Sequence, residues 1–168
     1  MSVETRQLAT VRATSGAWER LRILNENKTI AMVGLSADPM RPSHFAAIYM
    51  QSEGYDIVPV NPRYVGETIL GQAVYASLEE IPRPVQIVDV FRRPDEAPEI
   101  ARSAVGIGAR VLWLQLGVIN EEAARIAREA GLEVVMDRCV KIEHARFFGG
   151  LNLVGMNTGV ITARRRIG

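Results

Sequence analysis

The chain has 168 residues, of which 48% are hydrophobic and 23% are charged, and its formal net charge is +1. This length suffices for one hydrophobic core, so we expect one main domain. The near-neutral charge and an aromatic fraction of 6% argue against nucleic acid as a partner, because proteins that bind nucleic acid present basic surfaces and stacking rings.

The N-terminus lacks a basic segment followed by an apolar one, and no stretch approaches the roughly 20 apolar residues of a membrane span. Cys139 is the single cysteine, which excludes an intramolecular disulfide. We therefore expect a cytoplasmic protein with no membrane partner. No metal site is expected, because His44 and His144 lie far apart in the sequence.

Residues 8–26 carry apolar side chains at helical spacing, which predicts an amphipathic helix within an N-terminal extension of residues 1–27. Trp18, Leu21 and Leu24 lie on its apolar face. If these side chains do not pack on the chain's own sheet, they form an exposed apolar patch and favour a homodimer.

A strand, a turn and a helix follow in order. Residues 29–33 are an apolar run, Gly34-Leu35-Ser36 forms the turn, and helical spacing starts at Ser43 and ends near Gly54. The first N–H groups of a helix have no intrahelical partner, and the helix dipole adds partial positive charge. This arrangement predicts a site for an anion such as phosphate.

The same alternation continues to the end of the ordered pattern. Residues 63–71 are expected to form a loop, and Ser77 with Glu80 fits a capping box for one helical turn. Helices are expected at 94–106 and, capped by Asn120, at 121–130. Further strands are expected at 56–60, 85–91, 110–115 and 132–136.

Short apolar strands that alternate with helices indicate right-handed crossovers and a parallel sheet that is covered on both faces. The predicted fold class is α/β, a Rossmann-like three-layer sandwich with a mostly parallel five-stranded sheet. We assign it to residues 28–145 and leave 146–168 as a C-terminal tail.

Ligands of open parallel sheets bind beyond the carboxyl ends of the strands. The first of these ends does not fit a nicotinamide or flavin dinucleotide, because Ser36 and Pro39 stand where G-x-G-x-x-G has its second and third glycines. The second strand ends at Asn61, not at the acid that accepts a ribose hydroxyl. Both departures weaken a hydride-transfer function.

Five motifs at these strand ends resemble those of small stand-alone CoA-binding proteins, which are similar to the nucleotide-binding first domain of the succinyl-CoA synthetase α subunit. The resemblance runs from about residue 28 to about residue 145, and its motifs occur in the same order. The motifs are Val33-Gly-Leu-Ser36, Pro59-Val-Asn-Pro-Arg63, Val90-Phe-Arg-Arg-Pro94, Trp113-Leu-Gln-Leu-Gly117 and Val135-Met-Asp-Arg-Cys139.

The resemblance implies a site for coenzyme A. The turn and the helix start would hold the pyrophosphate, the end of the second strand would line the adenosine with Arg63 at the ribose 3′-phosphate, and the end of the third strand would pack on adenine or pantetheine. Arginine suits phosphate because its planar fork pairs bidentately. The implied ligand-binding residues are Gly34, Leu35, Ser36, Arg41, Ser43, His44, Val60, Asn61, Pro62, Arg63, Val90, Phe91, Arg92, Arg93 and Gln115.

Several of these residues have purely structural alternatives. Gly34 fits any tight turn between a strand and a helix, and Phe91 is as compatible with the core as with a ligand wall. Strand alternation allows only one of Arg92 and Arg93 to point inward. His44 either donates to a phosphate or is simply exposed.

Two features follow the fifth strand. Lys141, Glu143 and His144 are expected to form one solvated helical turn. We expect positive charge near Cys139 to lower the pKa of its thiol, and we hypothesise a mixed disulfide between Cys139 and the CoA thiol. The alternative is a buried, inert cysteine.

No residue is assigned a catalytic role. The sequence therefore predicts a module that binds CoA or an acyl-CoA without catalysing a reaction. The alternatives are an NAD(P)-binding oxidoreductase, an acyl-CoA ligase component that acts with a partner subunit, and an interaction protein whose nucleotide site is vestigial.

Overall fold

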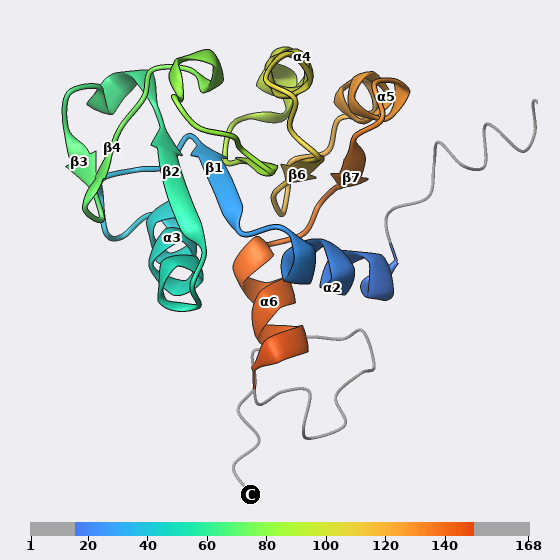
Figure 1. Cartoon of the computed structure of the whole chain (residues 1–168), viewed down its shortest axis with the longest axis horizontal. Helices are drawn as coiled ribbons and strands as arrows, with labels where there is room; N and C mark the ends of the chain where they lie inside the picture. The colour runs from blue at the N-terminus through green and yellow to red at the C-terminus, as the bar shows by residue number, and fades with distance from the viewer. Residues whose placement is uncertain (1–15, 150–168) are drawn as a thin grey trace, which may run out of the picture.

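A computed structural model describes residues 16–149 and contains a five-stranded sheet at its centre (Figure 1). The strands lie in the order β2-β1-β5-β6-β7, and each neighbouring pair is parallel. The predicted fold class is therefore confirmed. The bounds of the strands are β1 Thr29–Val33, β2 Asp56–Val60, β5 Ile87–Val90, β6 Val111–Leu114 and β7 Glu133–Val135.

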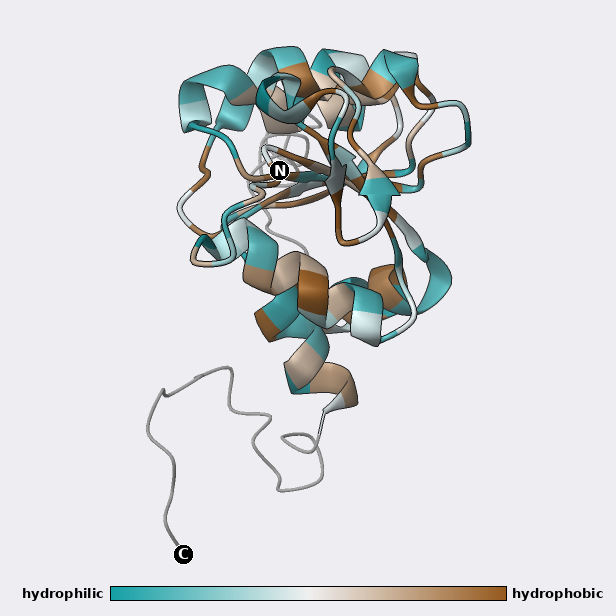
Figure 2. Cartoon of the chain, turned by 90° about the vertical axis from the view of Figure 1, so that its left-hand side faces the viewer, coloured by the Kyte–Doolittle hydropathy of each residue, from teal (hydrophilic) through white to brown (hydrophobic). Residues whose placement is uncertain are grey.

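Helices cover both faces of this sheet. Helices α4 (Ala97–Gly106) and α5 (Glu121–Glu129) lie on one face, and α2 (Ala17–Glu26), α3 (Pro42–Ser52) and α6 (Val140–Phe148) lie on the other (Figure 1). Figure 2 shows the apolar strands between these two layers. Strands buried on both faces need continuous apolar runs, which explains why the predicted strands could be located from composition alone.

Successive residues of β1 contribute to two separate core clusters. Ile30 and Met32 face the side of α3 and α6, whereas Ala31 faces the side of α4 and α5. This alternation follows from the two-residue period of a strand. The sheet therefore separates two apolar layers, and the polar groups of the site lie at its edge.

Local sequence signals account for several helix starts. Pro42 stands in the first turn of α3, where a missing N–H costs nothing. Asn120 caps α5 as predicted, because its side chain accepts a hydrogen bond of 2.9 Å from the backbone N–H of Ala123. The predicted capping box at Ser77 is wrong: Glu80 accepts from the N–H of Ala76 instead, and Ser77 makes no cap hydrogen bond.

The region after β2 is more structured than the sequence predicted. The expected loop at 63–71 overlaps a short antiparallel hairpin that packs beside β2. Strands of two residues are too short to show a periodic pattern, so the sequence could not reveal them. The short elements here and later in the chain are η1 Pro62–Tyr64, β3 Thr68–Ile69, β4 Gln72–Ala73, η2 Leu78–Glu80 and η3 Pro94–Glu96.

The N-terminal helix starts at Ala17 in the described part of the chain, and residues 8–15 of the predicted helix lie outside that part. Leu24 is completely buried, Leu21 packs against the same core cluster, and Trp18 is 80% exposed. Two of the three side chains whose exposure would have favoured a homodimer therefore pack within the chain.

The prediction of a solvated turn after the fifth strand is wrong, because this segment forms helix α6 and is partly buried. Glu143 and His144 are buried, and α6 packs against α2 and α3. Nε of Arg20 donates to Oε2 of Glu143 over 2.8 Å, and His144 Nδ1 lies 2.9 Å from the hydroxyl of Tyr49. Burial lowers the pKa of His144. Charged residues at these positions looked solvated because their partners are remote in sequence.

Helix α6 continues to Phe148, across the predicted boundary at 145/146, and residues 150–168 of the predicted tail lie outside the described part. Within residues 16–149, no helix is long and apolar enough to cross a bilayer.

The strand order creates a switch point in the sheet. From β1 the chain returns through α3 to β2 on one side, and β5, on the other side of β1, leads on to β6 and β7. The connections after β1 and β5 therefore diverge, and a crevice opens beyond their carboxyl ends.

Candidate ligand-binding cleft

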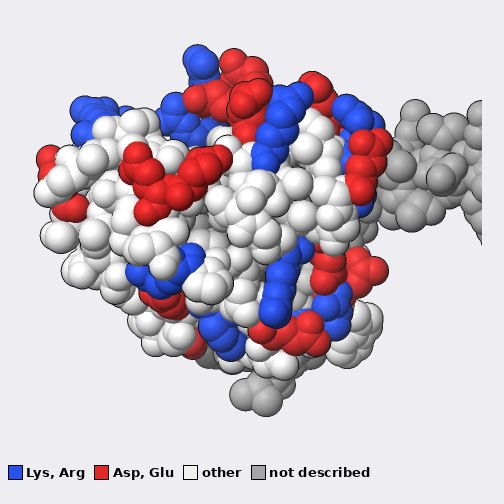
Figure 3. Space-filling view, turned by 45° about the horizontal axis from the view of Figure 1, so that its top comes forward, with Lys and Arg blue, Asp and Glu red and all other residues white. Residues whose placement is uncertain are grey.

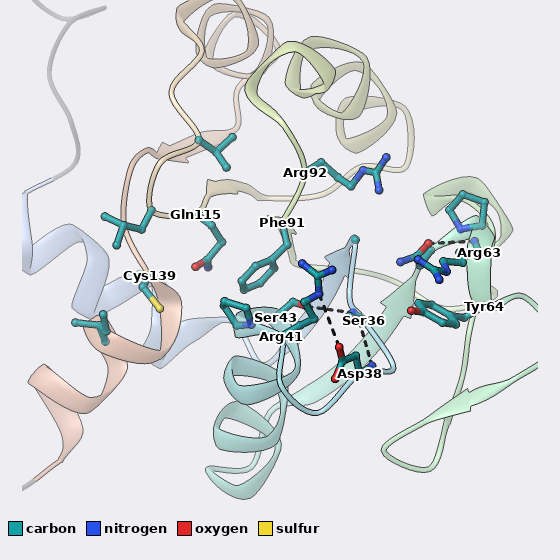
Figure 4. Close-up of a pocket in the computed structure, with 17 residues that line it drawn as sticks. Ser36, Asp38, Arg41, Ser43, Arg63, Tyr64, Phe91, Arg92, Gln115 and Cys139 are labelled. Carbon is teal, nitrogen blue, oxygen red and sulfur yellow. Dashed lines mark hydrogen bonds and ion pairs between the residues drawn. The ribbon is translucent and has the colours of Figure 1, made fainter.

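A cleft of about 990 Å³ lies at this carboxyl edge. It extends from the loop after β2, past the turn after β1, to the N-terminus of α6 (Figure 4). Its volume is in the range of cofactor sites. The lining residues are Gly34, Ser36, Asp38, Arg41, Pro42, Ser43, Asn61, Pro62, Arg63, Tyr64, Phe91, Arg92, Gln115, Leu116, Val118, Cys139 and Ile142.

The structure brings most of the sequence-predicted site residues to this cleft. They come from four separate strand ends and from the start of α3. The predicted residues that line the cleft are Gly34, Ser36, Arg41, Ser43, Asn61, Pro62, Arg63, Phe91, Arg92 and Gln115.

Five predicted residues do not line the cleft. Leu35, Val60 and Val90 are buried in the core clusters on the two faces of the sheet, and Val60 also lines the smaller cavity described below. His44 is turned inward, where its Nδ1 lies 2.8 Å from the carbonyl oxygen of Ser36. Arg93 points outward, with its side chain 76% exposed.

Six residues of the cleft wall were not predicted to contact the ligand, and Cys139 was connected with it only through the hypothesised mixed disulfide. Tyr64 and Leu116 directly follow assigned residues, so extending each motif by one position would have included them. Ile142 carried no signal, because it enters through the packing of α6. The six are Asp38, Pro42, Tyr64, Leu116, Val118 and Ile142.

Gly34 allows two strand ends to approach closely in the middle of the cleft. Its φ is +90°, and a Cβ at this position would lie 2.3 Å from the carbonyl oxygen of Phe91 and 2.7 Å from Cδ of Arg92. No side chain fits this space, and the left-handed backbone region also favours glycine. The backbone is therefore exposed to the cleft at the switch point.

The turn after Gly34 is fixed by hydrogen bonds within the chain. The N–H of Ser36 donates to Oγ of Ser43 over 3.1 Å, and Oγ of Ser36 accepts from the N–H of Asp38 over 3.1 Å. The N–H of Ser36 is therefore not available to a ligand, and the predicted phosphate site has one donor fewer. The hydroxyl proton of Ser43 remains a donor for a ligand, because its oxygen acts as the acceptor within the chain.

Three arginines stand along the outer part of the cleft and differ in their partners. Nη2 of Arg92 donates to Glu96 over 2.6 Å, and this hydrogen bond lowers the pKa of Glu96. Nε of Arg41 lies 3.9 Å from a carboxylate oxygen of Asp38. Figure 3 shows that basic and acidic side chains are interspersed on one face of the molecule.

Arg63 forms no ion pair with a carboxylate of residues 16–149. Its guanidinium lies 5.5 Å from the ring centre of Tyr64, and its backbone N–H donates to Oδ1 of Asn61 over 3.0 Å. Nδ2 of Asn61 donates to the carbonyl oxygen of Leu35. Asn61 therefore ties the end of β2 to the turn after β1 and holds the backbone of Arg63.

The inner part of the cleft, toward β6 and β7, contains a buried polar pair. Nε2 of Gln115 donates to Oδ1 of Asp89 over 2.7 Å, and both residues are buried. Burial raises the pKa of the Asp89 carboxyl to about 8. Asp89 is therefore mostly protonated at neutral pH, which is how a buried carboxyl without a cation avoids the cost of charge.

Cys139 also faces this inner part, directly before α6. Burial raises the pKa of its thiol, so the predicted lowering is wrong. The positive charge of Lys141 lowers this pKa, but burial has the larger effect because loss of solvent disfavours a thiolate. Burial therefore favours the neutral thiol of Cys139 over the thiolate.

A second, smaller cavity of about 480 Å³ adjoins the cleft on the face covered by α4. The two cavities share Gly34, Pro62 and Arg92. Apolar side chains and four carboxylates surround the smaller one. These residues are Val33, Val60, Leu78, Ile100, Glu79, Asp95, Glu96 and Glu99.

Comparison with known proteins identifies relatives of the whole sheet region. The protein YneT of Bacillus subtilis, described only as uncharacterized, is 45% identical over 123 residues, which cover 73% of this chain and 90% of YneT. The structure of a hypothetical protein from Pyrococcus horikoshii is 38% identical with a TM-score of 0.77, and the match covers 80% of this chain and 94% of that one.

A more distant structure shares the fold. A dinucleotide-forming acetyl-coenzyme A synthetase from Ca. Korarchaeum cryptofilum is 19% identical with a TM-score of 0.57, and the match covers 66% of this chain and 26% of the synthetase. At the level of sequence, residues 28–145 match the CoA binding domain family. The chain therefore belongs to the family of CoA-binding domains.

Proposed function

We propose that this chain binds coenzyme A or an acyl-CoA in the cleft at the carboxyl edge of the sheet. The observation that carries the proposal is the continuity of the site: one cleft runs from Arg63 past Gly34 to Gln115 and Cys139. An elongated ligand with a charged end and a neutral arm fits a cleft with Arg63 at one end and the uncharged Gln115 and Cys139 at the other. Membership of the CoA-binding family supports the same ligand.

The adenosine would occupy the smaller cavity beside the cleft. Its apolar wall, with Val60 and Leu78, suits a flat ring, and carboxylates such as Glu79 and Glu99 can accept from an exocyclic amino group. Arg63 then lies nearby to bind the ribose 3′-phosphate. This arrangement agrees with the role that the sequence resemblance implied for the end of β2.

The pyrophosphate would lie beside Gly34, where no side chain intervenes. Arg41 and the hydroxyl of Ser43 offer donors at the start of α3, and the dipole of this helix adds partial positive charge. Asp38 lies on the same wall, but its Oδ1 accepts from the N–H of Met40 and its Oδ2 faces Arg41. The residues present therefore fit the diphosphate of CoA.

We also propose that the domain binds its ligand without catalysis of its own. His44 is turned away from the cleft, and His144 on α6 is buried, with its Nδ1 2.9 Å from the hydroxyl of Tyr49 on α3. The raised pKa of Cys139 disfavours a nucleophilic thiolate. These features leave no histidine or activated cysteine of the described residues in contact with the ligand.

The cytoplasmic location and the homodimer remain predictions from the sequence.

A thermal-shift series with CoA, acetyl-CoA, dephospho-CoA, NAD and NADP tests the proposal. A ligand that binds only the folded state stabilises it by about 2.7 kcal/mol at a concentration of 100 times its Kd. We expect CoA and acetyl-CoA to raise the Tm, dephospho-CoA to raise it less, and NAD and NADP to leave it unchanged.

A shift with NAD or NADP and none with CoA would overturn the proposal in favour of an oxidoreductase. An unchanged Tm with every nucleotide would also overturn it and favour a vestigial site. Product formation from acetyl-CoA, followed by mass spectrometry, would contradict the absence of catalysis while leaving the ligand assignment intact.

A further inference from the structure

The buried pair of Gln115 and Asp89 gives the inner end of the cleft a fixed polarity. Gln115 is 4% exposed and still contributes to the cleft wall. Asp89 is completely buried in the middle of β5, one strand away. A buried carboxyl in the centre of a parallel sheet is costly unless a hydrogen bond satisfies it.

The hydrogen bond between the two side chains directs one amide atom of Gln115 toward the core and leaves the other for a ligand. Nε2 of Gln115 donates to Oδ1 of Asp89 over 2.7 Å, so the amide nitrogen is committed to the core. The other amide atom, Oε1, accepts no hydrogen bond from the described residues. Figure 4 shows the amide of Gln115 directed into the space between Phe91 and Cys139.

We infer that Oε1 of Gln115 accepts a hydrogen bond from an amide N–H of the pantetheine arm, and that Asp89 is the positioning residue that fixes the orientation of this acceptor. The inference rests on the proposed function, because it assumes that the pantetheine arm lies in the inner part of the cleft. The ligand then has one polar contact in the inner part of the cleft, in addition to its contacts at the phosphate end.

The arm carries two amide N–H groups, a hydroxyl and a thiol, and we assign the donor to an amide because the hydroxyl lies at the outer end of the arm, next to the pyrophosphate. A thiol S–H donates only weakly, whereas an amide N–H bonds well to a carbonyl oxygen. Both amides are present in free CoA, in its thioesters and in its disulfides. Recognition through Gln115 therefore does not depend on the group bound to the sulfur. The expected ligands are all CoA derivatives with an unaltered pantetheine amide.

Calorimetric titration of Gln115→Leu tests the contact with three probes. Adenosine 3′,5′-bisphosphate lacks the pantetheine arm, and desulfo-CoA keeps the amides but lacks the thiol. The variant is expected to bind CoA and desulfo-CoA about tenfold more weakly than wild type, the upper range for one hydrogen bond. Its affinity for adenosine 3′,5′-bisphosphate is expected to be unchanged, which also reports that the fold is intact.

Two substitutions of Asp89 test the positioning role. Asp89→Asn keeps an oxygen that accepts from Gln115, so its CoA affinity is expected to stay near that of wild type. Asp89→Leu removes the acceptor and is expected to reproduce the loss seen with Gln115→Leu, again without an effect on adenosine 3′,5′-bisphosphate. Rescue by asparagine separates this role from simple loss of packing.

The outcomes distinguish the inference from the function on which it rests. If wild type binds neither CoA nor the bisphosphate, the proposed function fails. If wild type binds both and Gln115→Leu weakens both equally or neither, the contact with the arm is refuted. A loss for CoA that is absent for desulfo-CoA would move the donor to the thiol and contradict the inference as stated.

Discussion

The two ends of the cleft hold their polar groups in opposite ways. At the outer end, near β1 and β2, the charged side chains are exposed, as in Arg41, whose side chain is 67% exposed. At the inner end, Gln115 and Asp89 are buried and hydrogen-bonded to each other. The outer end offers exposed charge, and the inner end offers a buried, mostly neutral contact.

This difference matches the two halves of the proposed ligand. Exposed arginines attract phosphates over a long range, but salt screens them and each contributes little. A buried neutral hydrogen bond has a short range, is not screened, and depends on precise placement. The outer end is therefore suited to capture, and the inner end to orientation of the arm.

Asp89→Asn tests the neutrality of the inner end and carries the largest expected effect. The folded pKa of Asp89 is raised to about 8 from an ordinary 3.8, so between about pH 4 and pH 8 the folded state holds a proton that the unfolded state has lost. This group then lowers the free energy of unfolding by up to about 1.4 kcal/mol for each unit of rising pH. Asparagine removes that dependence.

Denaturant unfolding of both proteins from pH 4 to pH 9 measures the difference. The variant is expected to gain stability relative to wild type as the pH rises, with the gain levelling off above about pH 8. Parallel curves for the two proteins would mean that Asp89 is ionised throughout, and the neutral character of the inner end would be refuted.

Gly34→Ala tests the junction between the two ends. The new Cβ would meet the backbone of Phe91 at 2.3 Å and would sit at a φ of +90°. Strain and overpacking together are expected to cost about 3 kcal/mol, with loss of CoA binding. Gly54→Ala is the matched control, because its φ is +91° and no atom lies within 4 Å of the new Cβ.

The control is expected to lose only about 1 kcal/mol and to bind CoA normally. Thermal unfolding and calorimetry of the two variants provide the comparison. Equal losses of stability in both variants would show that the close approach of Phe91 contributes nothing beyond the backbone conformation.

Arg63→Ala tests the charged outer end. The side chain has no carboxylate partner within residues 16–149, so its loss removes a phosphate contact without breaking an ion pair. The affinity for CoA is expected to fall about tenfold, and the affinity for dephospho-CoA is expected to remain unchanged. Arg125→Ala is the control, because it removes the same charge from α5, where Arg125 pairs with Glu129.

Titration at two salt concentrations sharpens this test. Wild type should lose affinity for CoA as salt increases, and Arg63→Ala should lose less. A similar loss for dephospho-CoA in the variant would place Arg63 at another phosphate and contradict its assignment to the ribose 3′-phosphate.

The fold could be predicted because its signals are local. Five apolar runs bounded by turn residues located the strands, and crossover rules then gave a parallel sheet. The small hairpin at β3 and β4 had no such signal. Glu143 and His144 were misjudged because burial depended on Arg20 and Tyr49, which are 123 and 95 residues away in the chain.

The site could be predicted in outline because strand ends converge in any parallel sheet. The sequence does not indicate which side chain at each strand end faces the cleft. In the structure Ser36 lines the cleft, whereas Leu35 and Val90 are buried. The role of Asp89 could not be predicted from the sequence, since an acid inside an apolar strand gives no indication of its partner. The raised pKa of Cys139 likewise follows from burial, which the sequence around Arg138 and Cys139 did not reveal.

Cys139 provides the last and smallest test, because it asks whether the inner end is chemically inert. Its raised pKa leaves little thiolate at pH 7. With CoA disulfide, a thiolate of Cys139 would attack one sulfur, form the mixed disulfide and release one CoA thiolate. Intact-mass measurement is expected to show a slow adduct at pH 7 that forms faster as pH rises, and none on Cys139→Ser. If wild type stays unmodified even at pH 9, the thiol does not reach the ligand's sulfur, and the cleft binds the arm without touching its reactive end.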